Sequence, residues 1–492
     1  MIIKQIVITL CLLVFIITAR AQSCDCTFSQ VQNNTVTPCN LTIGTVVTVN
    51  SVSGLRNAIL QANSTGGNMT ILIANGTYQI SSTAWYPTIF EDNVVIRSLS
   101  GNRDLVILRG GGMKDVSPDV EDGILIIGDN VTIADLTIVE VGNHAIQVSG
   151  HHVLIHNVKI QNAYQQMIKG ATSAASIDSG IVQCSLMEYP GGIGPNYYIG
   201  GIDIHKGNGW IVRDNIYRNI ISPAGSLAEH AVHFWNNCAN NIVERNLIIN
   251  CDRGIGFGLG TSANTGGIIR NNMIYNNGLA QFNDVGIALE TSPNTKVYNN
   301  TVYVNYRNAI EYRWAATTNV DIKNNLTNKS IASRDGGTGT LATNVTNAQA
   351  SWFVNVASGD LHLVESIFSV VDQGTDLTSI VNEDIDKTLR PQGSSFDIGA
   401  HEFTLSQNIQ ENNRINDNLV IYPNPGNGIF TVKSEIKISE IEITDFLGAV
   451  IHAEQINYDQ AEINLSKYPK GIYFYKIKNG KEILKTGKII IQ

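Results

Sequence analysis

The stretch EHAVHFW, Glu229–Trp235, places two histidines, a glutamate and a tryptophan within seven residues. Its polar and apolar residues alternate, and a period of two is typical of a β-strand. An imidazole can act as a general base and a carboxylate as an acid or a metal ligand. What such a strand can do depends on the strands that lie above and below it.

Similar segments recur along the chain and predict a solenoid. In each of them a polar residue precedes a turn, and alternation then resumes. These residues are Asp135, Asn157, Asn215, Asn246, Asn272, Asn300 and Asn325, with Cys184 filling the gap, at intervals of 22 to 31 residues. A repeat of this length that is built from strands is typical of stacked coils. Asparagine tolerates left-handed backbone, and its amide can bond to an identical amide one coil away.

This pattern resembles the right-handed parallel β-helix of the pectate-lyase-like superfamily, over roughly residues 50 to 345. The alternative is a β-propeller or a β-sandwich, but equal blades of about 40 to 50 residues are absent. Residues 49–63 have helical spacing and are expected to cap the open N-terminal end. The segment DIDKTLRPQGSSFDIGAHEF, 384–403, resembles the closing segment of secreted bacterial β-helix proteins. We therefore assign residues 49–403 to an all-β solenoid.

The strands after the turns align by their inward apolar residues, which leaves two outward columns. The third positions are Gln147, Lys169, Asp203, His233, Gly256, Ala288 and Glu311. The fifth positions are Ser149, Ala171, His205, Trp235, Gly258, Glu290 and Arg313. Neighbours in a column lie about 4.8 Å apart, and the columns lie about 6.6 Å apart. The two columns are expected to form a charged groove with an aromatic platform at Trp235 and a floor at Gly256 and Gly258.

A β-eliminating lyase on a uronate polysaccharide is the first interpretation of this patch, because it needs a cation, a base and an acid. Arg253, Arg313 or Lys169 could neutralise the substrate carboxylate. His233 or His205 could be the base, with Asp203 orienting His233, and Lys169 is a further candidate for the base. His230 and Arg253 are expected at the rim, so that His233 would do chemistry and His230 would bind substrate.

Two other functions stay open. Glu290 and Glu311 lie about 8 Å apart by strand geometry, within the range for an inverting glycoside hydrolase. Alternatively, Glu290 and Arg313 form a simple ion pair and the face belongs to a non-catalytic glycan-binding protein or adhesin. No single enzyme family is recognised.

A third column, Glu229, Asp252 and Asp284, precedes these strands and could bind calcium. Capping of the turns is the favoured explanation for these carboxylates. The sequence does not require a cofactor, and Ca²⁺ is the one ion that these carboxylates could bind.

The two ends of the chain carry export signals. Residues 1–21 read as a signal peptide with a short apolar core. Residues 22–48 form an N-terminal segment in which a disulfide among Cys24, Cys26 and Cys39 is plausible. After a polar linker, 404–418, residues 419–492 contain YPNP and KGIYFYKI. They resemble the C-terminal sorting domain of the type IX secretion system of Bacteroidetes, and a carbohydrate-binding sandwich is the alternative.

The composition of the chain limits which classes of binding partner are expected. The net charge is −9 and only 15% of residues are charged, so nothing favours nucleic-acid binding. No segment beyond the signal peptide is apolar enough for a transmembrane helix. The expected protein is a monomer, secreted or held at the cell surface, whose partners are a polysaccharide and the type IX machinery.

Overall fold

The structure, a computed structural model, describes residues 24–80, 87–113, 122–171, 176–223, 225–278, 284–404, 419–434, 437–445, 448–480 and 482–492. The chain divides into two compact units, Met1–Phe403 and Thr404–Gln492. The predicted signal peptide and residues 405–418 of the predicted linker lie outside the described residues. None of the helices in the described ranges has the length and hydrophobicity of a membrane span.

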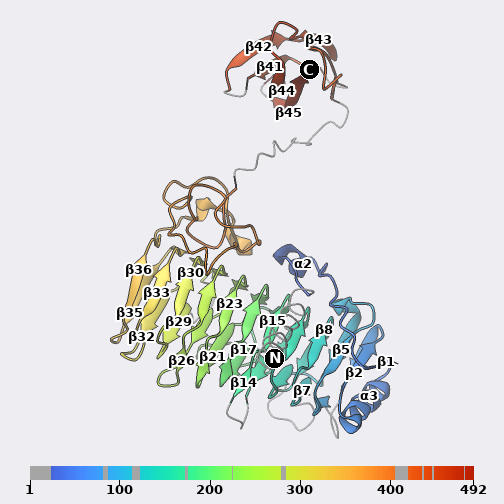
Figure 1. The fold of residues 1–492 in the computed structure, drawn as a ribbon, viewed down its shortest axis with the longest axis vertical. Coiled ribbons are helices and arrows are strands. Elements are labelled where there is room, and N and C mark those ends of the chain that lie inside the picture. Colours follow the sequence, from blue (N-terminus) through green and yellow to red (C-terminus); the bar gives the residue numbers. More distant parts are fainter. Residues whose placement is uncertain are drawn as a thin grey trace, which may run out of the picture. The chain divides into compact units, whose positions relative to one another are not determined.

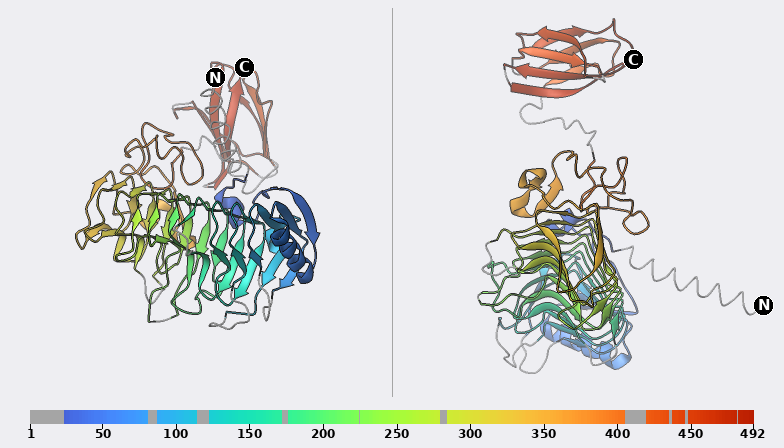
Figure 2. Two further views of the ribbon diagram at one scale, coloured as in Figure 1. Left: turned by 60° about the horizontal axis from the view of Figure 1, so that its bottom comes forward. Right: turned by 90° about the vertical axis from the view of Figure 1, so that its left-hand side faces the viewer.

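The first unit is a right-handed parallel β-helix, as predicted, and its coils stack along one axis (Figures 1 and 2). The first sheet has 12 strands in the order β1 (Thr45–Val49), β2 (Met69–Ile73), β5 (Val94–Ser98), β8 (Thr132–Ala134), β11 (Leu154–His156), β15 (Ile181–Gln183), β19 (Ile211–Arg213), β23 (Ile242–Glu244), β27 (Ile268–Arg270), β30 (Lys296–Tyr298), β33 (Val320–Lys323) and β36 (Gly339–Ala342).

Two further sheets complete the coils. The second sheet has 10 strands, β4 (Thr88–Ile89), β7 (Ile124–Ile126), β10 (Ile146–Val148), β13 (Gln166–Gly170), β17 (Gly200–His205), β21 (Val232–Trp235), β25 (Ile255–Phe257), β29 (Val285–Glu290), β32 (Asn308–Arg313) and β35 (Ser330–Arg334). The third sheet also has 10, β3 (Gly76–Gln79), β6 (Val106–Arg109), β9 (Thr137–Val141), β12 (Lys159–Ala163), β16 (Leu186–Glu188), β20 (Ile216–Arg218), β24 (Leu247–Ile249), β28 (Met273–Tyr275), β31 (Thr301–Tyr303) and β34 (Leu326–Thr327). A small sheet joins β14 (Ile177–Asp178), β18 (Gly207–Asn208), β22 (Cys238–Ala239) and β26 (Asn264–Thr265).

The core of the solenoid consists of stacked apolar side chains. In the second sheet Ile202 pairs with Val232, and Ile204 pairs with Phe234, and all four are fully buried. These are the inward positions that the alternation predicts. The pairing therefore fixes which residues of each strand can leave the core on the outer face.

An asparagine ladder runs through one turn of the coils. It comprises Asn215, Asn246, Asn272, Asn300, Asn325 and Asn344, and the amide nitrogen of each donates to the amide oxygen of the next at 2.9–3.1 Å. The amides are thereby paired with one another inside the solenoid, where an unpaired polar group would be costly.

The predicted ladder was wrong by one residue in its first three members. Asp135, Asn157 and Cys184 occupy the preceding column, where the backbone is left-handed with φ of 57°, 49° and 58°. Ser185 stands beside Asn215 instead, and its N–H donates to the Asn215 side-chain oxygen at 3.0 Å. Asparagine suits both adjacent positions, so the sequence alone does not separate the two columns.

The N-terminal part of the chain caps the solenoid and is cross-linked to it. The helix α3 (Val52–Thr65) buries Leu55, Ala58, Ile59 and Ala62, as its spacing predicts. The short helix α2 (Phe28–Gln32) precedes it, and Cys24 forms a disulfide with Cys39. A second disulfide, which the sequence did not indicate, joins Cys26 to Cys184 across 158 residues. This cross-link ties the N-terminal segment to the middle of the solenoid.

Residues 345–403 fold back over the outer face of the third sheet (Figure 1). They contain η2 (Ala350–Trp352), β37 (Phe353–Asn355), η3 (Val356–Ser358) and β38 (Asp360–Leu363). The remaining short helix, η1 (Arg103–Leu105), lies earlier in the chain, directly before β6. Phe353, Leu361 and Ile398 pack against outward residues of the sheet such as Leu247 and Met273. The buried guanidinium of Arg390 donates to Glu402 at 2.6 Å, so a paired charge anchors this segment.

The second unit is a small antiparallel sandwich. One sheet contains β39 (Val420–Tyr422), β40 (Ile429–Lys433) and β43 (Gln460–Asn464), and the other contains β42 (Val450–Gln455), β41 (Glu440–Thr444), β44 (Gly471–Asn479) and β45 (Glu482–Ile491). Its core is its own, built around residues such as Phe430, Ile441 and Ile477. The unit therefore carries an independent hydrophobic core.

Asn246→Leu is expected to lower the free energy of unfolding by about 1–3 kcal/mol, because neighbouring buried groups lose their partners. Asn246 makes side-chain bonds to Asn215, Asn272, Val212 and Glu244. The measurement is the urea midpoint of the β-helix unit. Asn347→Leu, at an exposed position of ordinary backbone, is the matched control. Equal midpoints for both variants would contradict the buried ladder.

His362→Gln is expected to destabilise the segment 345–403 in a pH-dependent way. Burial alone would lower the pKa of His362, but hydrogen bonds to Asp360 and Asp386 raise it to about 10. A raised pKa contributes stability that is complete below about pH 6.5 and is lost as pH rises towards 10. The difference in urea midpoint between wild type and variant should therefore shrink over that interval. A difference that grows with pH would refute the ion pair.

Candidate functional site

The predicted outer columns form on the second sheet with the predicted register. In the third-position column, β-pairing joins Gln147 to Lys169, Lys169 to Asp203, Asp203 to His233, His233 to Gly256, Gly256 to Ala288 and Ala288 to Glu311. In the fifth-position column it joins His205 to Trp235 and Glu290 to Arg313. Residues far apart in sequence thus meet on one face.

The columns do not form the open groove that the alternation suggested. The whole-residue exposure is 8% for Lys169, 2% for Asp203, 0% for His233 and 4% for Glu311. In the fifth-position column the side chains are more accessible, with 20% of His205 and 23% of Arg313 exposed. Side chains stacked at the strand spacing cover one another, which alternation by itself does not reveal.

Lys169, Asp203 and His205 form one connected cluster. The ammonium of Lys169 lies 2.5 Å from Asp203 Oδ2 and 3.1 Å from His205 Nε2. Burial alone would raise the pKa of Asp203, but a hydrogen bond to His205 and the charges of Lys169 and His233 hold it below its usual range. Asp203 is therefore a permanent carboxylate that positions the lysine.

Trp235 completes the cluster. Its indole N–H donates to Asp203 Oδ1 at 2.7 Å. Its ring meets His205 edge-on, with centroids 4.4 Å apart, and lies nearly parallel to His233 at 5.6 Å. The indole is thus fixed by one hydrogen bond and two rings, and it separates the partly exposed histidine from the buried one.

The predicted glycine floor is wrong, because other groups occupy that space. A Cβ on Gly256 would lie 2.7 Å from the ring of His230, which is 4% exposed and does not lie at a rim. A Cβ on Gly258 would lie 1.6 Å from the carbonyl oxygen of Glu290, and the backbone there is left-handed with φ of 76°. Both glycines are needed for close packing.

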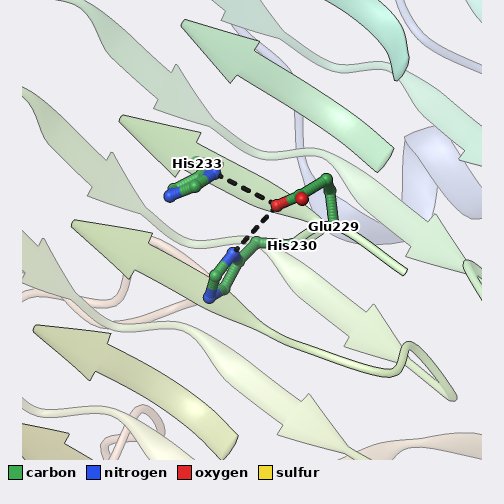
Figure 3. A group of neighbouring side chains, drawn as sticks. All are labelled: Glu229, His230 and His233. Carbon is green, nitrogen blue, oxygen red and sulfur yellow. Dashed lines mark ion pairs between the residues drawn. The ribbon is translucent and has the colours of Figure 1, made fainter. Parts of the chain in front are cut away.

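His233 is oriented by the backbone and enclosed by side chains. Its Nε2 donates to the carbonyl of Gly258 at 3.2 Å. Its Nδ1 faces Glu229 Oε2 at 3.6 Å and Asp203 Oδ1 at 3.7 Å (Figure 3 shows the glutamate). Burial lowers the pKa of His233, although the two carboxylates oppose this, and burial with the neighbouring His233 lowers the pKa of His230 further. Because His233 has no exposed surface, a substrate proton has no access to it.

The other half of the columns is a set of paired charges. Glu290 Oε2 accepts from the N–H of Gly260 at 2.7 Å, and its Oε1 lies 3.7 Å from Arg313. Glu311 accepts from Arg334 at 2.6 Å and from Asn308 at 2.5 Å. Both candidate hydrolase carboxylates are therefore already bound by cations and donors.

The predicted calcium column is also engaged. Asp252 caps the loop before β21 by accepting from the N–H groups of Ser222 and Ala228. Asp284 lies 3.4 Å from Arg253, which also lies 3.8 Å from Glu229. In the part of the chain that the structure describes, these three carboxylates do not converge as a group of ligands. The capping explanation therefore describes Asp252 well.

Two other groups bring potential metal ligands together. One is Glu229, His230 and His233 (Figure 3), and the other is Asp384, Asp386 and His401. In the second group the possible ligand atoms already have hydrogen-bond partners. Asp384 accepts from three backbone N–H groups, Asp386 pairs with His362, and His401 Nδ1 accepts from the N–H of Leu363.

Several residues of the site were not found from the sequence. Arg334 donates to Glu311, and the indole of Trp314 donates to Glu290. Asp335 accepts from Arg313, and Asn236 contacts His205 at 3.4 Å. His144 is buried nearby, with its Nδ1 against the carbonyl of Gln166. Of these residues, only Arg334 could have been predicted from the strand alignment, because on β35 it continues the fifth-position column after Arg313.

Comparison with known proteins agrees with the architecture. Residues 122–327 match the family described as the right handed beta helix region, and residues 420–492 match the secretion system C-terminal sorting domain. The sorting domain indicates export by type IX secretion. No curated protein matches the chain.

The chain is similar to several solved structures at low sequence identity. Pectate lyase Pel9A is 15% identical with a TM-score of 0.53, and the match covers 70% of this chain and 90% of that one. A mutant of the PL6 family alginate lyase AlyGC is 12% identical with a TM-score of 0.40 and coverages of 76% and 60%. The periplasmic alginate epimerase AlgG is 14% identical with a TM-score of 0.33 and coverages of 64% and 75%.

Gly256→Ala is expected to destabilise the β-helix by about 1–3 kcal/mol, because its methyl group would overlap the enclosed ring of His230. Gly191→Ala is the matched control, since a Cβ there meets nothing within 4 Å. The free energy of unfolding of both variants is measured by urea titration. If Gly256→Ala were as stable as the control, His230 would not occupy the place above Gly256.

Proposed function

Because the chain is a right-handed parallel β-helix protein with a C-terminal type IX sorting domain, we propose that it acts on a polysaccharide outside the cell. More specifically, we propose a lyase that cleaves a uronate-containing polysaccharide by β-elimination. The likeness to a pectate lyase supports this by analogy of fold. The chemical support is the contact between Lys169 and His205.

β-Elimination places two demands on neighbouring atoms of the substrate. A cation must stabilise the negative charge that develops on the carboxylate, and a base must take the proton from C5. The carboxylate carbon is bonded directly to C5, so the cation and the base must lie side by side. The 3.1 Å contact of Lys169 Nζ with His205 Nε2 is the observation that meets this demand.

The roles follow from charge and access. Lys169, paired with Asp203, binds the substrate carboxylate, and His205 takes the C5 proton. The electron pair of the C5–H bond forms the C4–C5 double bond as the bond from C4 to the glycosidic oxygen breaks. The imidazolium of His205 then returns the proton to that departing oxygen. Trp235 offers a platform beside His205, and its indole N–H helps to hold Asp203 in place.

The hydrolase alternative has weaker support. Hydrolysis needs a protonated carboxylic acid and a second free carboxylate. Glu290 and Glu311 are each paired with an arginine, so neither is a free carboxyl group. A purely glycan-binding role remains the third candidate, and the panel described next distinguishes all three.

The test is incubation of the purified chain with a panel of uronate and neutral polysaccharides. New ultraviolet absorbance from unsaturated uronate ends is the expected result. Reducing ends without that absorbance would indicate hydrolysis and would direct substitution to Glu290 and Glu311. Binding without any cleavage would refute both enzymatic functions.

On the polymer that the panel identifies, His205→Ala is expected to lower kcat by about 10²–10⁴-fold, because it removes the general base. Lys169→Met should lower kcat and raise KM as well, since it removes the cation that binds the carboxylate. His452→Ala, in the second unit, is the control for histidine removal. Near-normal turnover of His205→Ala would contradict the assigned base.

A further inference from the structure

Beneath the accessible cluster lies a set of buried polar atoms without hydrogen-bond partners. They are Glu229 Oε2, both ring nitrogens of His230 and Nδ1 of His233. The exposed fraction of the side chain is 4% for His230 and 0% for His233. Buried polar atoms in proteins are nearly always paired, so a cluster of unpaired ones needs an occupant or a reason.

Figure 3 shows a ring nitrogen of His230 and one of His233 directed toward one point, the Oε2 atom of Glu229. Glu229 Oε2 lies 4.0 Å from His230 Nδ1 and 3.6 Å from His233 Nδ1. Glu229 and His230 directly precede β21 and His233 lies within it, and Glu229 keeps 21% of its side chain exposed. One edge of the cluster therefore has access to solvent.

The tautomer of His233 leaves a lone pair directed at this point. Because Nε2 donates to the Gly258 carbonyl, Nδ1 is free to accept or to coordinate. Metal-binding histidines commonly donate their second ring nitrogen to a backbone carbonyl in this manner. The two carboxylate oxygens that face Nδ1 are 3.6 and 3.7 Å away, beyond hydrogen-bond distance and suited to an ion between them.

We infer that Glu229, His230 and His233 form a binding site for a divalent transition-metal ion of the zinc class. Two imidazoles and one carboxylate are donors that zinc accepts, whereas calcium prefers oxygen ligands alone. Ligand atoms of a tetrahedral zinc lie about 3.4 Å apart. A movement of about 0.2–0.6 Å would bring the glutamate oxygen to that spacing from the two imidazole nitrogens, which lie 3.6 and 4.0 Å from it.

The neighbouring charges are compatible with the ion. Arg253 lies 3.8 Å from Glu229, but its Nε faces Asp284 at 3.4 Å, so the guanidinium has another carboxylate partner. Asp203, 3.7 Å from His233 Nδ1, adds negative charge on the other side. This site does not depend on the proposed reaction, because it is defined by ligand atoms and not by substrate.

The first test measures zinc stoichiometry on the untagged full chain after chelator treatment and reloading. We expect one tightly bound Zn²⁺ per wild-type chain and at least about tenfold weaker binding for Glu229→Gln and His230→Gln. His401→Gln, from the second ligand group, and His205→Gln, from the same face, should bind zinc as wild type does. Absence of zinc from wild type, or equal binding by Glu229→Gln, would overturn the inference.

A second measurement does not depend on the folding of any variant. X-ray absorption of the zinc-loaded wild type should show two imidazole nitrogens and at least one oxygen at about 2.0–2.2 Å. A sulfur ligand or a shell without imidazole would overturn the assignment. Ca²⁺ at the same concentration should not displace the zinc, and displacement would favour an all-oxygen site instead.

Discussion

The parallel register of the second sheet is the constraint on which the site depends. Hydrogen bonding between coils holds equivalent positions of β13, β17, β21 and β25 one strand spacing apart. The register therefore fixes the two neighbours of each side chain on that face. Charges must be compatible with the residue above and below, and Lys169 beside Asp203 is the clearest case.

This constraint explains why the two halves of the face differ. Around Asp203 a single carboxylate serves a lysine and an indole, and it lies near two histidines, so one side chain organises four others. Around Glu290 and Glu311 each carboxylate has its own arginine. The first arrangement leaves a partly exposed imidazole beside an ammonium, whereas the second neutralises its charges and holds the coils together.

The sequence predicted the coils well because alternation and asparagine recur in every one. It placed Lys169, Asp203 and His233 in one column and His205 and Trp235 in the next, as the pairing confirms. It failed where the outcome depends on side-chain volume and direction. His230 fills the place above Gly256, and His233 is enclosed by Trp235 and His230, although alternation predicts only that outward residues leave the core. The Cys26–Cys184 disulfide joins segments whose proximity no local pattern encodes.

In the proposed reaction Lys169 and His205 together bind a uronate, with its carboxylate on the lysine and C5 beside the imidazole. The most direct measurement is a crystal structure of the His205→Gln variant with a bound uronate oligosaccharide. We expect a substrate carboxylate within ion-pair distance of Lys169 Nζ and C5 next to position 205. A carboxylate bound instead at Arg253 or Arg313, away from Lys169, would contradict it.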